Sequence, residues 1–269
     1  MITCHGGGRL GNHMFRIAAT LGLAYKNGTF AVFPYLNFPS PCGRTTLSHY
    51  LKTIFHSLNK SGDHNIFIYE FQEPPYTSTI YHEIPFMDGM ILRGHFQSYK
   101  YFDFCRDLII NSFKLPEHMI EEMDKKYKHI LNKTDTTSIH IRRGDYLSLV
   151  GIYEILGVEY YKQALKMLGD NQEIVVFSDD IEWCKTALSF IPKEKIHFIE
   201  GEEDVCDLYL MSKIKNNIIS NSTFSWWAAY LNENKDKKVI APWSWFGPKR
   251  VSCNYKETAD LIPENWIRI

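Results

Sequence analysis

Two adjacent arginines in the middle of the chain are the residues best suited to chemistry. Arg142 and Arg143 lie within residues 140–146, which have the sequence H-I-R-R-G-D-Y. A guanidinium stays charged at any physiological pH and can donate two parallel hydrogen bonds to phosphate oxygens. The pair therefore predicts a diphosphate-binding site, and a sugar nucleotide is a ligand that suits it. The alternative is a surface turn whose ion pairs are weak.

A glycine-rich turn near the start of the chain is the second candidate. Gly6, Gly8 and Gly11 have the G-x-G-x-x-G spacing after a predicted strand and before a predicted helix. A nicotinamide- or flavin-dependent oxidoreductase is therefore an alternative. That fingerprint also needs an acidic residue about twenty positions further on, where residues 33–37 have the sequence F-P-Y-L-N.

The glycine turn has a second interpretation as part of a binding site. It would bring Arg9, Asn12 and His13 to the mouth of the first domain, near a helix N-terminus that favours negative charge. A purely structural turn is the alternative. The H-G-G-G sequence at residues 5–8 resembles an esterase oxyanion loop, but the chain has no G-x-S-x-G nucleophile motif, so a hydrolase is excluded.

Small polar residues between a predicted strand and a predicted helix form the third candidate. Ser222 and Thr223 lie within residues 220–227, S-N-S-T-F-S-W-W. Their hydroxyl and backbone N–H groups can cap the helix and can also bind phosphate oxygens. We expect Trp226 and Trp227 to pack in the core.

Paired acids follow another predicted strand. Asp179 and Asp180 follow residues 173–177, with Ser178 between them and the predicted strand. They suit a ribose or a base edge, or they cap the next helix. The chain has no D-x-D, H-E-x-x-H or P-loop motif, so no metal is expected. If the reaction releases a diphosphate, arginine has to stabilise it.

Length and composition predict a two-domain protein that does not bind nucleic acid or anionic lipid through its overall charge. The 269 residues are 45% hydrophobic, enough for two domains of roughly 130 residues with a cleft. The formal net charge of −1 gives no field for nucleic acid or anionic lipid. Six scattered cysteines without a C-x-x-C pair suggest reduced, buried thiols. With no signal or transmembrane segment, we expect a cytoplasmic protein; peripheral membrane association and oligomeric state stay open.

The first half of the chain predicts a β-α-β opening and then irregular structure. Residues 2–5 and 29–33 are predicted strands around a helix at 13–26. Residues 34–85 are irregular, with a helix at 47–58 and a strand at 66–69. Loops of this kind commonly shape substrate sites.

The second half alternates regularly between strands and helices. A strand at 90–94 and helices at 99–113 and 116–131 precede the polar linker Lys133–Thr136. The predicted strands that follow are 137–141, 173–177, 196–199, 217–220 and 239–241, and the predicted helices are 160–168, 181–190, 205–213 and 224–231. This alternation predicts an α/β fold with a parallel sheet and helices on both faces.

Taken together, these motifs resemble glycosyltransferase family 11, the α-1,2-fucosyltransferases. The resemblance covers nearly the whole chain and includes residues 8–15, G-R-L-G-N-H-M-F, where His13 replaces the usual glutamine. It continues in residues 94–102, 140–146, 222–231 and 261–266, and the 140–146 motif is shared with α-1,6-fucosyltransferases.

The resemblance implies a GT-B-like fold with two Rossmann-like domains facing a central cleft. The expected domains are residues 1–133 on the acceptor side and 134–269 for GDP-fucose. It also implies that GDP-β-L-fucose is the donor and that no metal is used. It further implies that the anomeric carbon is inverted and that the acceptor is a galactose-containing glycan, with O2 of a terminal galactose as the acceptor atom.

The resemblance also implies roles for single residues. Arg142 would contact the β-phosphate, with Arg143 and Asp145 ordering the loop. The nucleotide pocket would be lined by Ser222, Thr223 and Phe224. Arg9 and Asn12 would face the sugar and the acceptor. Apart from the resemblance, we also expect Arg9, His140 and Asp179 among the donor-binding residues. The expected catalytic residues are Arg142, Asp145, Asn12 and His13.

The general base is not identified by any motif, and Asp145, His13 and Glu154 are the candidates. A lectin-like or sugar-nucleotide-binding module without turnover is the alternative from another functional class.

Overall fold

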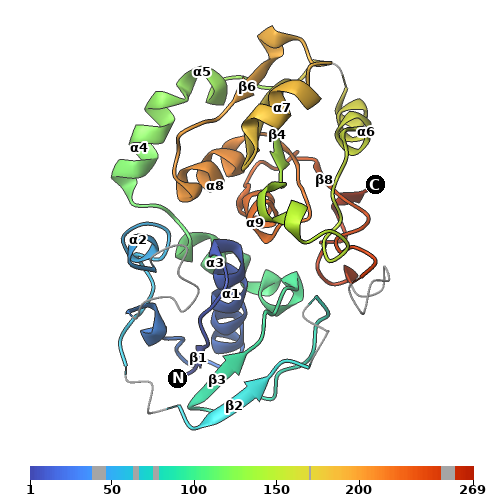
Figure 1. Ribbon diagram of the computed structural model, residues 1–269. Coiled ribbons are helices and arrows are strands. Elements are labelled where there is room, and N and C mark those ends of the chain that lie inside the picture. Colours follow the sequence, from blue (N-terminus) through green and yellow to red (C-terminus); the bar gives the residue numbers. More distant parts are fainter. Residues whose placement is uncertain (38–46, 63–66, 75–78, 170, 250–257) are drawn as a thin grey trace. The chain divides into compact units, whose positions relative to one another are not determined.

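The chain forms two compact α/β units in the computed structural model, which describes residues 1–37, 47–62, 67–74, 79–169, 171–249 and 258–269. The first unit contains Met1–Pro116 and Lys256–Pro263, and the second contains Glu117–Tyr255 and Glu264–Ile269 (Figure 1). This division differs from the expected boundary at residues 133 and 134.

Side-chain contacts explain why residues 117–131 belong to the second unit. Tyr209 donates a hydrogen bond to Asp124 at 2.7 Å, and Lys126 forms an ion pair with Glu202. The helices at 117–131 therefore pack within the second unit, and the polar segment at 133–136 does not mark the division.

The first unit contains a small sheet, one long helix and several short helical segments. Its elements are β1 Thr3–Cys4, α1 Leu10–Lys26, η1 Pro34–Asn37, α2 Leu47–Lys52, β2 Tyr69–Gln72, β3 Met90–Arg93, η3 Tyr99–Tyr101, η4 Asp103–Cys105 and α3 Arg106–Ser112. The strands are parallel, in the order β1-β3-β2.

Helix α1 forms because its apolar residues recur on one face. Leu10, Met14 and Ile17 are buried at spacings of three and four. The helix ends where Gly28 adopts a φ of +60°, which glycine accommodates without strain. Because α1 begins at Leu10 and not at residue 13, Asn12 lies inside its first turn.

Several predicted elements of the first unit are shorter than expected. The strand predicted at 29–33 is reduced to a single parallel bridge between Ile2 and Ala31. The backbone N–H of Phe33 instead donates to Asn59, and Pro34 has no N–H to extend the ladder.

The helical predictions for this unit were also too long. Residues 99–105 form the two 3-10 segments η3 and η4, so that only 106–112 of the predicted 99–113 helix is α-helical. Helix α2 ends at Lys52 and not at residue 58, and the strand predicted at 66–69 is found at Tyr69–Gln72, with residue 66 outside the described residues.

The second unit follows the predicted alternation closely. Its helices are α4 Glu117–Lys126, α5 Lys128–Leu131, α6 Val158–Leu168, α7 Ile181–Ala187, α8 Asp204–Lys213 and α9 Thr223–Leu231, with the 3-10 segments η5 Gly144–Ser148 and η6 Lys193–Lys195. Its strands are β4 Thr136–Ile141, β5 Glu173–Ser178, β6 Ile196–Phe198, β7 Asn216–Ile218, β8 Val239–Ala241 and β9 Ile267–Arg268. The sequence did not predict β9.

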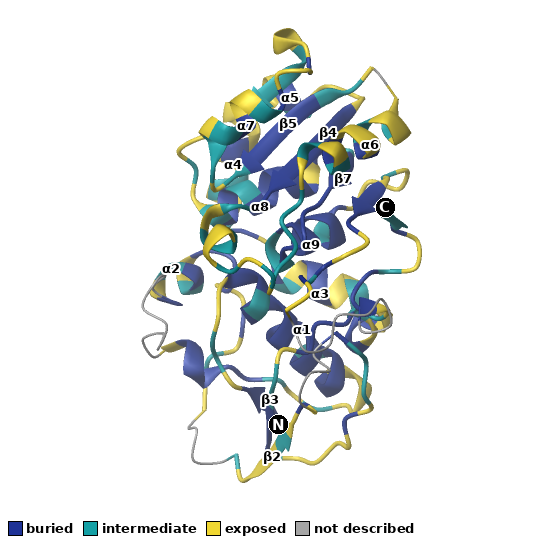
Figure 2. Cartoon of the chain, turned by 45° about the vertical axis from the view of Figure 1, so that its right-hand side comes forward, coloured by how far each residue is buried: buried dark blue, intermediate teal, exposed yellow. Residues whose placement is uncertain are grey.

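All strands of the second unit are parallel, in the order β6-β5-β4-β7-β8-β9. Figure 2 shows that β4, β5 and β7 are buried. Their register pairs Ile139 with Val176 on one side and with Ile218 on the other. A parallel sheet needs both faces covered, which the helices provide.

The two faces of this sheet have different chemistry. Ile139 and Ile141 belong to an apolar cluster with residues of α6 and α7. The alternate residues of β4 face α8 and α9, and they are polar: Ser138 accepts a hydrogen bond from Asn217 at 2.7 Å, and His140 lies against Phe224.

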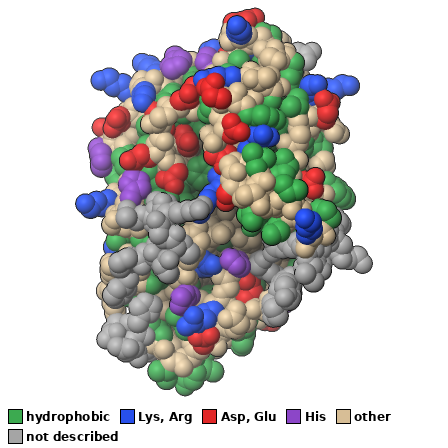
Figure 3. Space-filling model, in the orientation of Figure 1, with side chains coloured by type: hydrophobic (Ala, Val, Ile, Leu, Met, Phe, Trp, Pro, Cys, Tyr) green, Lys and Arg blue, Asp and Glu red, His purple; other side chains and the backbone are tan. Residues whose placement is uncertain are grey.

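Other expectations concern the cysteines and the surface. Four cysteines are free and buried, as predicted, at positions 4, 105, 184 and 206; Cys42 and Cys253 lie outside the described residues. Figure 3 shows acidic and basic side chains interspersed on the visible face of the second unit. Among the described residues, no helix combines the length and apolarity needed to cross a membrane.

We predict that Gly22→Ala destabilises the first unit. A Cβ at this position of α1 would lie 2.2 Å from the carbonyl oxygen of Tyr101. The overpacking cost should exceed the gain in helix propensity and lower the free energy of unfolding by about 1–2 kcal/mol. Urea-induced unfolding measures the change, and an unchanged midpoint would contradict the packing. Gly157→Ala is the control, since a Cβ there meets no atom within 4 Å.

Candidate active site

The centre of the candidate site is the carboxyl end of β4. The chain places β5 and β6 on one side of β4 and β7, β8 and β9 on the other. Open α/β sheets bind ligands outside the carboxyl ends of the strands, where the strand order reverses. Arg142 follows β4 directly at this point, and Asp179 follows β5. The topology therefore brings together residues that the sequence singled out separately.

Two carboxylates hold the guanidinium of Arg142. Its Nη2 donates to Oδ1 of Asp145 at 2.5 Å, and its Nη1 lies 2.8 Å from Oδ2 of Asp179. The Arg142 side chain is only 17% exposed, and its guanidinium carbon lies 5.4 Å from the ring centroid of Tyr146. A cation in this position has little conformational freedom and a fixed direction.

Arg143 has a different environment from its neighbour. Its Nε lies 3.0 Å from Oδ2 of Asp180, and its guanidinium carbon lies 3.9 Å from the ring centroid of Trp183. Asp180 also caps α7 by accepting a hydrogen bond from the backbone N–H of Trp183 at 3.2 Å. Of the two interpretations that the sequence left open for Asp180, helix capping is observed.

Asp179 connects the two strand ends. One of its carboxylate oxygens lies beside Arg142, and the other accepts a hydrogen bond from the backbone N–H of Arg143 at 2.8 Å. A Cβ on Gly144 would lie 2.5 Å from Oδ2 of Asp179. The glycine of the R-R-G-D motif is therefore required by this close approach.

The start of α9 forms the other side of the site. The Ser222 side chain accepts a hydrogen bond from the backbone N–H of Phe224 at 3.4 Å and caps the helix. Asn221 donates to the carbonyl oxygens of Glu154 and Trp245 at 2.9 and 2.8 Å. The N-terminal end of this nine-residue helix carries partial positive charge. Tyr146 connects it to Arg142, because the Tyr146 hydroxyl donates to the carbonyl oxygen of Asn221 at 3.1 Å and the Tyr146 ring lies against the guanidinium.

His140 lies beneath this surface and not on it. Its Nδ1 lies 2.8 Å from the hydroxyl of Ser220, and the side chain is buried. Burial lowers the pKa of His140 to about 4, so the ring is neutral near pH 7. Trp226 and Trp227 are fully buried, as the sequence predicted.

The predicted residues of the first unit lie around the start of α1. Arg9 occupies the N-cap position and is exposed, and Asn12 accepts a hydrogen bond from Gln97 at 3.0 Å. His13 is buried and stacks on Tyr35, with ring centroids 6.0 Å apart. Burial lowers the pKa of His13 to about 4.

Two charged residues that the sequence did not single out hold this region together. Arg16 donates to the carbonyl oxygens of Gly94, at 2.5 Å, and Gly7. Glu73 accepts hydrogen bonds from the backbone N–H groups of His95 and Phe96 at 2.6 and 2.9 Å. Arg16 is a buried charged residue in the middle of α1, among apolar and small residues, which was a usable signal; Glu73 lies in a segment predicted to be irregular, which offered none.

The fold combines a Rossmann-like unit, with its parallel sheet covered by helices, and a smaller α/β unit, and it defines a GT-B-like architecture. The Glycosyl transferase family 11 model matches residues 1–269, and the chain belongs to that family.

Sequence relatives agree with this assignment. The chain is 35% identical over 192 residues to the O-antigen biosynthesis glycosyltransferase WbnK of Escherichia coli, and the match covers 68% of this chain and 61% of that protein. It is 40% identical over 153 residues to an alpha-1,2-colitosyltransferase of Escherichia coli, covering 54% and 51%. It is 26% identical over 292 aligned residues to galactoside alpha-(1,2)-fucosyltransferase 1 of Leontopithecus chrysomelas, covering 97% and 76%. The first two matches thus span about half to three fifths of those relatives.

Solved structures share the fold at low sequence identity. The fucosyltransferase NodZ from Bradyrhizobium superposes with a TM-score of 0.56 at 12% identity, covering 85% of this chain and 92% of that chain. A second NodZ structure, an alpha-1,6-fucosyltransferase soaked with GDP-fucose, gives a TM-score of 0.53 at 11% identity, covering 86% and 92%.

We predict that His140→Asn weakens the acid sensitivity of the fold. A folded-state pKa of about 4 means that the unfolded chain binds more protons between about pH 6.5 and 4. The stability contributed by neutral His140 is therefore lost as the pH falls through this window, at a cost of about 3 kcal/mol. Urea unfolding at a series of pH values should show a smaller loss for the variant than for the wild type.

The matched control is His118→Gln, at an exposed position on α4. This variant should retain the wild-type loss of stability on acidification. Equal pH dependence in the His140→Asn variant and the wild type would show that the His140 ring is protonated at little cost in the folded state.

Proposed function

We propose that this chain transfers L-fucose from GDP-β-L-fucose to a glycan, with O2 of a terminal galactose as the acceptor atom and inversion at the anomeric carbon. The observation that carries the proposal is Arg142, fixed between Asp145 and Asp179 at the switch point of the sheet. Family membership and the α-1,2-transferases among the relatives support the reaction class and the linkage.

The proposed chemistry concerns the charge that develops on the leaving group. Breaking the C1–O bond of the donor passes through an oxocarbenium-like state and places negative charge on the departing GDP. Arg142 would stabilise that charge in place of a metal ion. Its Nη2 donates to Asp145 and its Nη1 forms an ion pair with Asp179, and its other N–H groups would bind phosphate oxygens.

Other residues of the second unit would support the donor. Ser222 and Thr223 at the start of α9 would offer hydroxyl and N–H groups to the phosphates, and Phe224 would line the pocket. We propose that Asp179 and His140 act by holding the arginine loop and the start of α9, because their polar atoms already face those elements. The second unit is thus proposed as the donor domain, and the first as the acceptor domain.

The acceptor-side roles are proposed for the turn that begins α1. Arg9 is exposed and Asn12 is half-buried, and both would bind sugar hydroxyls. His13 is enclosed by Tyr35 and Phe55 and is neutral near pH 7, so we propose that it supports Asn12 by packing. Asp145 is proposed as a positioning residue that acts through its ion pair with Arg142.

A colitosyl group is the second candidate for the transferred sugar. The observation that favours it is the 40% identity to an alpha-1,2-colitosyltransferase. Comparing GDP-fucose with GDP-colitose at equal concentration would decide between the two donors.

The direct test is product analysis. The protein is incubated with GDP-fucose and a panel of β-galactosides, GDP release is measured, and the product linkage is determined by NMR. We expect an α-1,2-fucoside and a rate that EDTA leaves almost unchanged. GDP binding without turnover would indicate the lectin-like module, and stabilisation by NAD(P)H but not by GDP would indicate an oxidoreductase.

We predict that Arg142→Lys preserves the fold and lowers kcat by roughly a hundredfold. A lysine keeps the positive charge but loses the planar fork that binds two oxygens at once, and removal of one oxyanion donor costs about 2–4 kcal/mol in other enzymes. Steady-state kinetics with GDP-fucose measure the loss.

Arg268→Lys is the matched control. Arg268 ends β9 in the same unit, and its guanidinium carbon lies 5.2 Å from the ring centroid of Trp243. Its substitution makes the same arginine-to-lysine change beside an aromatic ring, but away from β4. The control should retain wild-type kcat. If Arg142→Lys also does, the role proposed for Arg142 is wrong.

A further inference from the structure

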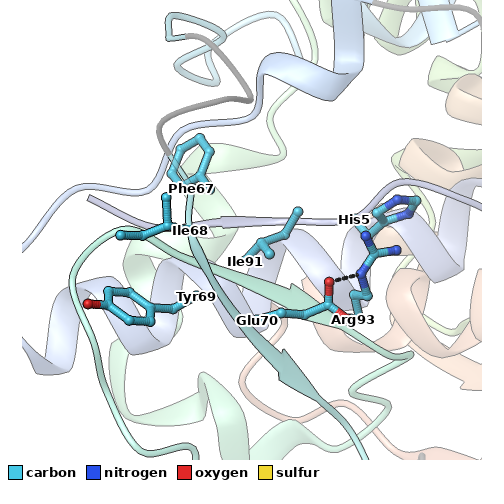
Figure 4. Close-up of a pocket in the computed structure, with 7 residues that line it drawn as sticks. All are labelled: His5, Phe67, Ile68, Tyr69, Glu70, Ile91 and Arg93. Carbon is cyan, nitrogen blue, oxygen red and sulfur yellow. Dashed lines mark ion pairs between the residues drawn. The ribbon is translucent and has the colours of Figure 1, made fainter.

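We propose that a hollow on the sheet of the first unit binds a neutral pyranose residue of the acceptor glycan, an inference that rests on the proposed function. The hollow has a volume of about 390 Å³ and is lined by His5, Phe67, Ile68, Tyr69, Glu70, Ile91 and Arg93 (Figure 4). Small-molecule sites commonly have volumes of about 300–1,000 Å³.

The strand register explains how these residues come together. Ile91 of β3 pairs with Glu70 of β2, and the parallel pairing of β1 with β3 continues to His5, whose N–H donates to Leu92 at 2.8 Å. Because side chains alternate along a strand, Glu70, Ile91 and Arg93 lie on one face of the sheet. The opposite face carries Leu92, which is fully buried.

The hollow has a polar end. Glu70 and Arg93 form an ion pair whose side chains are 47% and 40% exposed, and His5 lies beside Arg93 (Figure 4). The pair offers both donors and acceptors and has no net charge. Sugar hydroxyls donate and accept in the same way, so this end suits a neutral sugar better than an anion.

The other end of the hollow is apolar. Phe67 and Ile68 lie away from the ion pair, and Ile91 lies between the two ends (Figure 4). A pyranose ring has a C–H face that packs on an aromatic side chain and a hydroxyl edge that needs hydrogen bonds. The two ends of the hollow match these two requirements.

The hollow also adjoins the acceptor-side turn within the same unit. His5 immediately precedes the Gly6–Gly8 turn, and Arg93 immediately precedes Gly94, whose carbonyl oxygen is held by Arg16. The backbone segments that position the hollow therefore continue into the ones that position Asn12, which accepts a hydrogen bond from Gln97. This continuity assigns the hollow to acceptor recognition.

Two variants test the proposal by separating acceptor from donor kinetics. Glu70→Gln removes the carboxylate charge at nearly constant shape, and Phe67→Ala removes the apolar wall. Each should raise the KM for a β-galactoside acceptor about tenfold, with unchanged KM for GDP-fucose and an unchanged rate of acceptor-independent donor hydrolysis. Glu83→Gln is the control, since Glu83 is 82% exposed and pairs only distantly with Lys26, at 3.8 Å.

Saturation-transfer NMR with the same β-galactosides and GDP measures binding without turnover. Together with the kinetics, it separates a failure of the proposed sugar site from a failure of the proposed transferase function. If the wild type transfers fucose and both variants keep its acceptor KM, the hollow is not an acceptor site and the proposed function stands. If the wild type does not transfer fucose but binds the saccharide, and both variants lose that binding, the sugar site stands and the transferase proposal fails. Saccharide binding that neither variant weakens overturns the assignment of the hollow, and so does a wild type that binds no saccharide.

Discussion

The structure of the second unit depends on keeping one guanidinium charged, fixed and partly buried. A cation removed from water is costly unless carboxylates and hydrogen bonds compensate it. Asp145 and Asp179 supply that compensation for Arg142 from two different strand ends. The arrangement leaves no room for a side chain at Gly144, which lies directly against Asp179. The charges of the R-R-G-D motif are thus balanced only when Asp179, which follows the neighbouring strand β5, pairs with Arg142.

Buried polar side chains position backbone in both units. In the second unit, His140 contacts Ser220 and so joins the end of β4 to the turn before α9. In the first unit, Arg16 binds the carbonyl oxygen of Gly94, and Glu73 binds the N–H groups that follow it. Burial raises the pKa of Glu73, and the backbone hydrogen bonds oppose that shift. A polar group without water must be hydrogen-bonded, so each of these residues fixes the loop that satisfies it.

Local sequence patterns predicted the elements well where packing agreed with them. The regular alternation after residue 133 predicted the strands and helices of the second unit, because buried parallel strands and amphipathic helices have distinct periods. The pattern failed at residues 29–33 and 99–105. There, a competing hydrogen bond from Phe33 to Asn59 and a run of 3-10 turns replaced the ladder and the helix. The hydrogen bond of Phe33 joins residues 26 positions apart, which a local pattern does not report.

The sequence by itself determined the chemistry of the site: the adjacent arginines, the glycine after them, and the Ser-Thr turn that begins a helix. Tertiary structure decided which of these groups act together. Arg142 and Asp179 are 37 positions apart and become neighbours only because β4 and β5 pair in parallel. Tertiary structure also placed His13 and His140 in the interior, since burial depends on what packs around a helix or strand. Residue types carry charge and hydrogen-bonding capacity, but only the folded chain sets distance and desolvation, on which the strength of every such interaction depends.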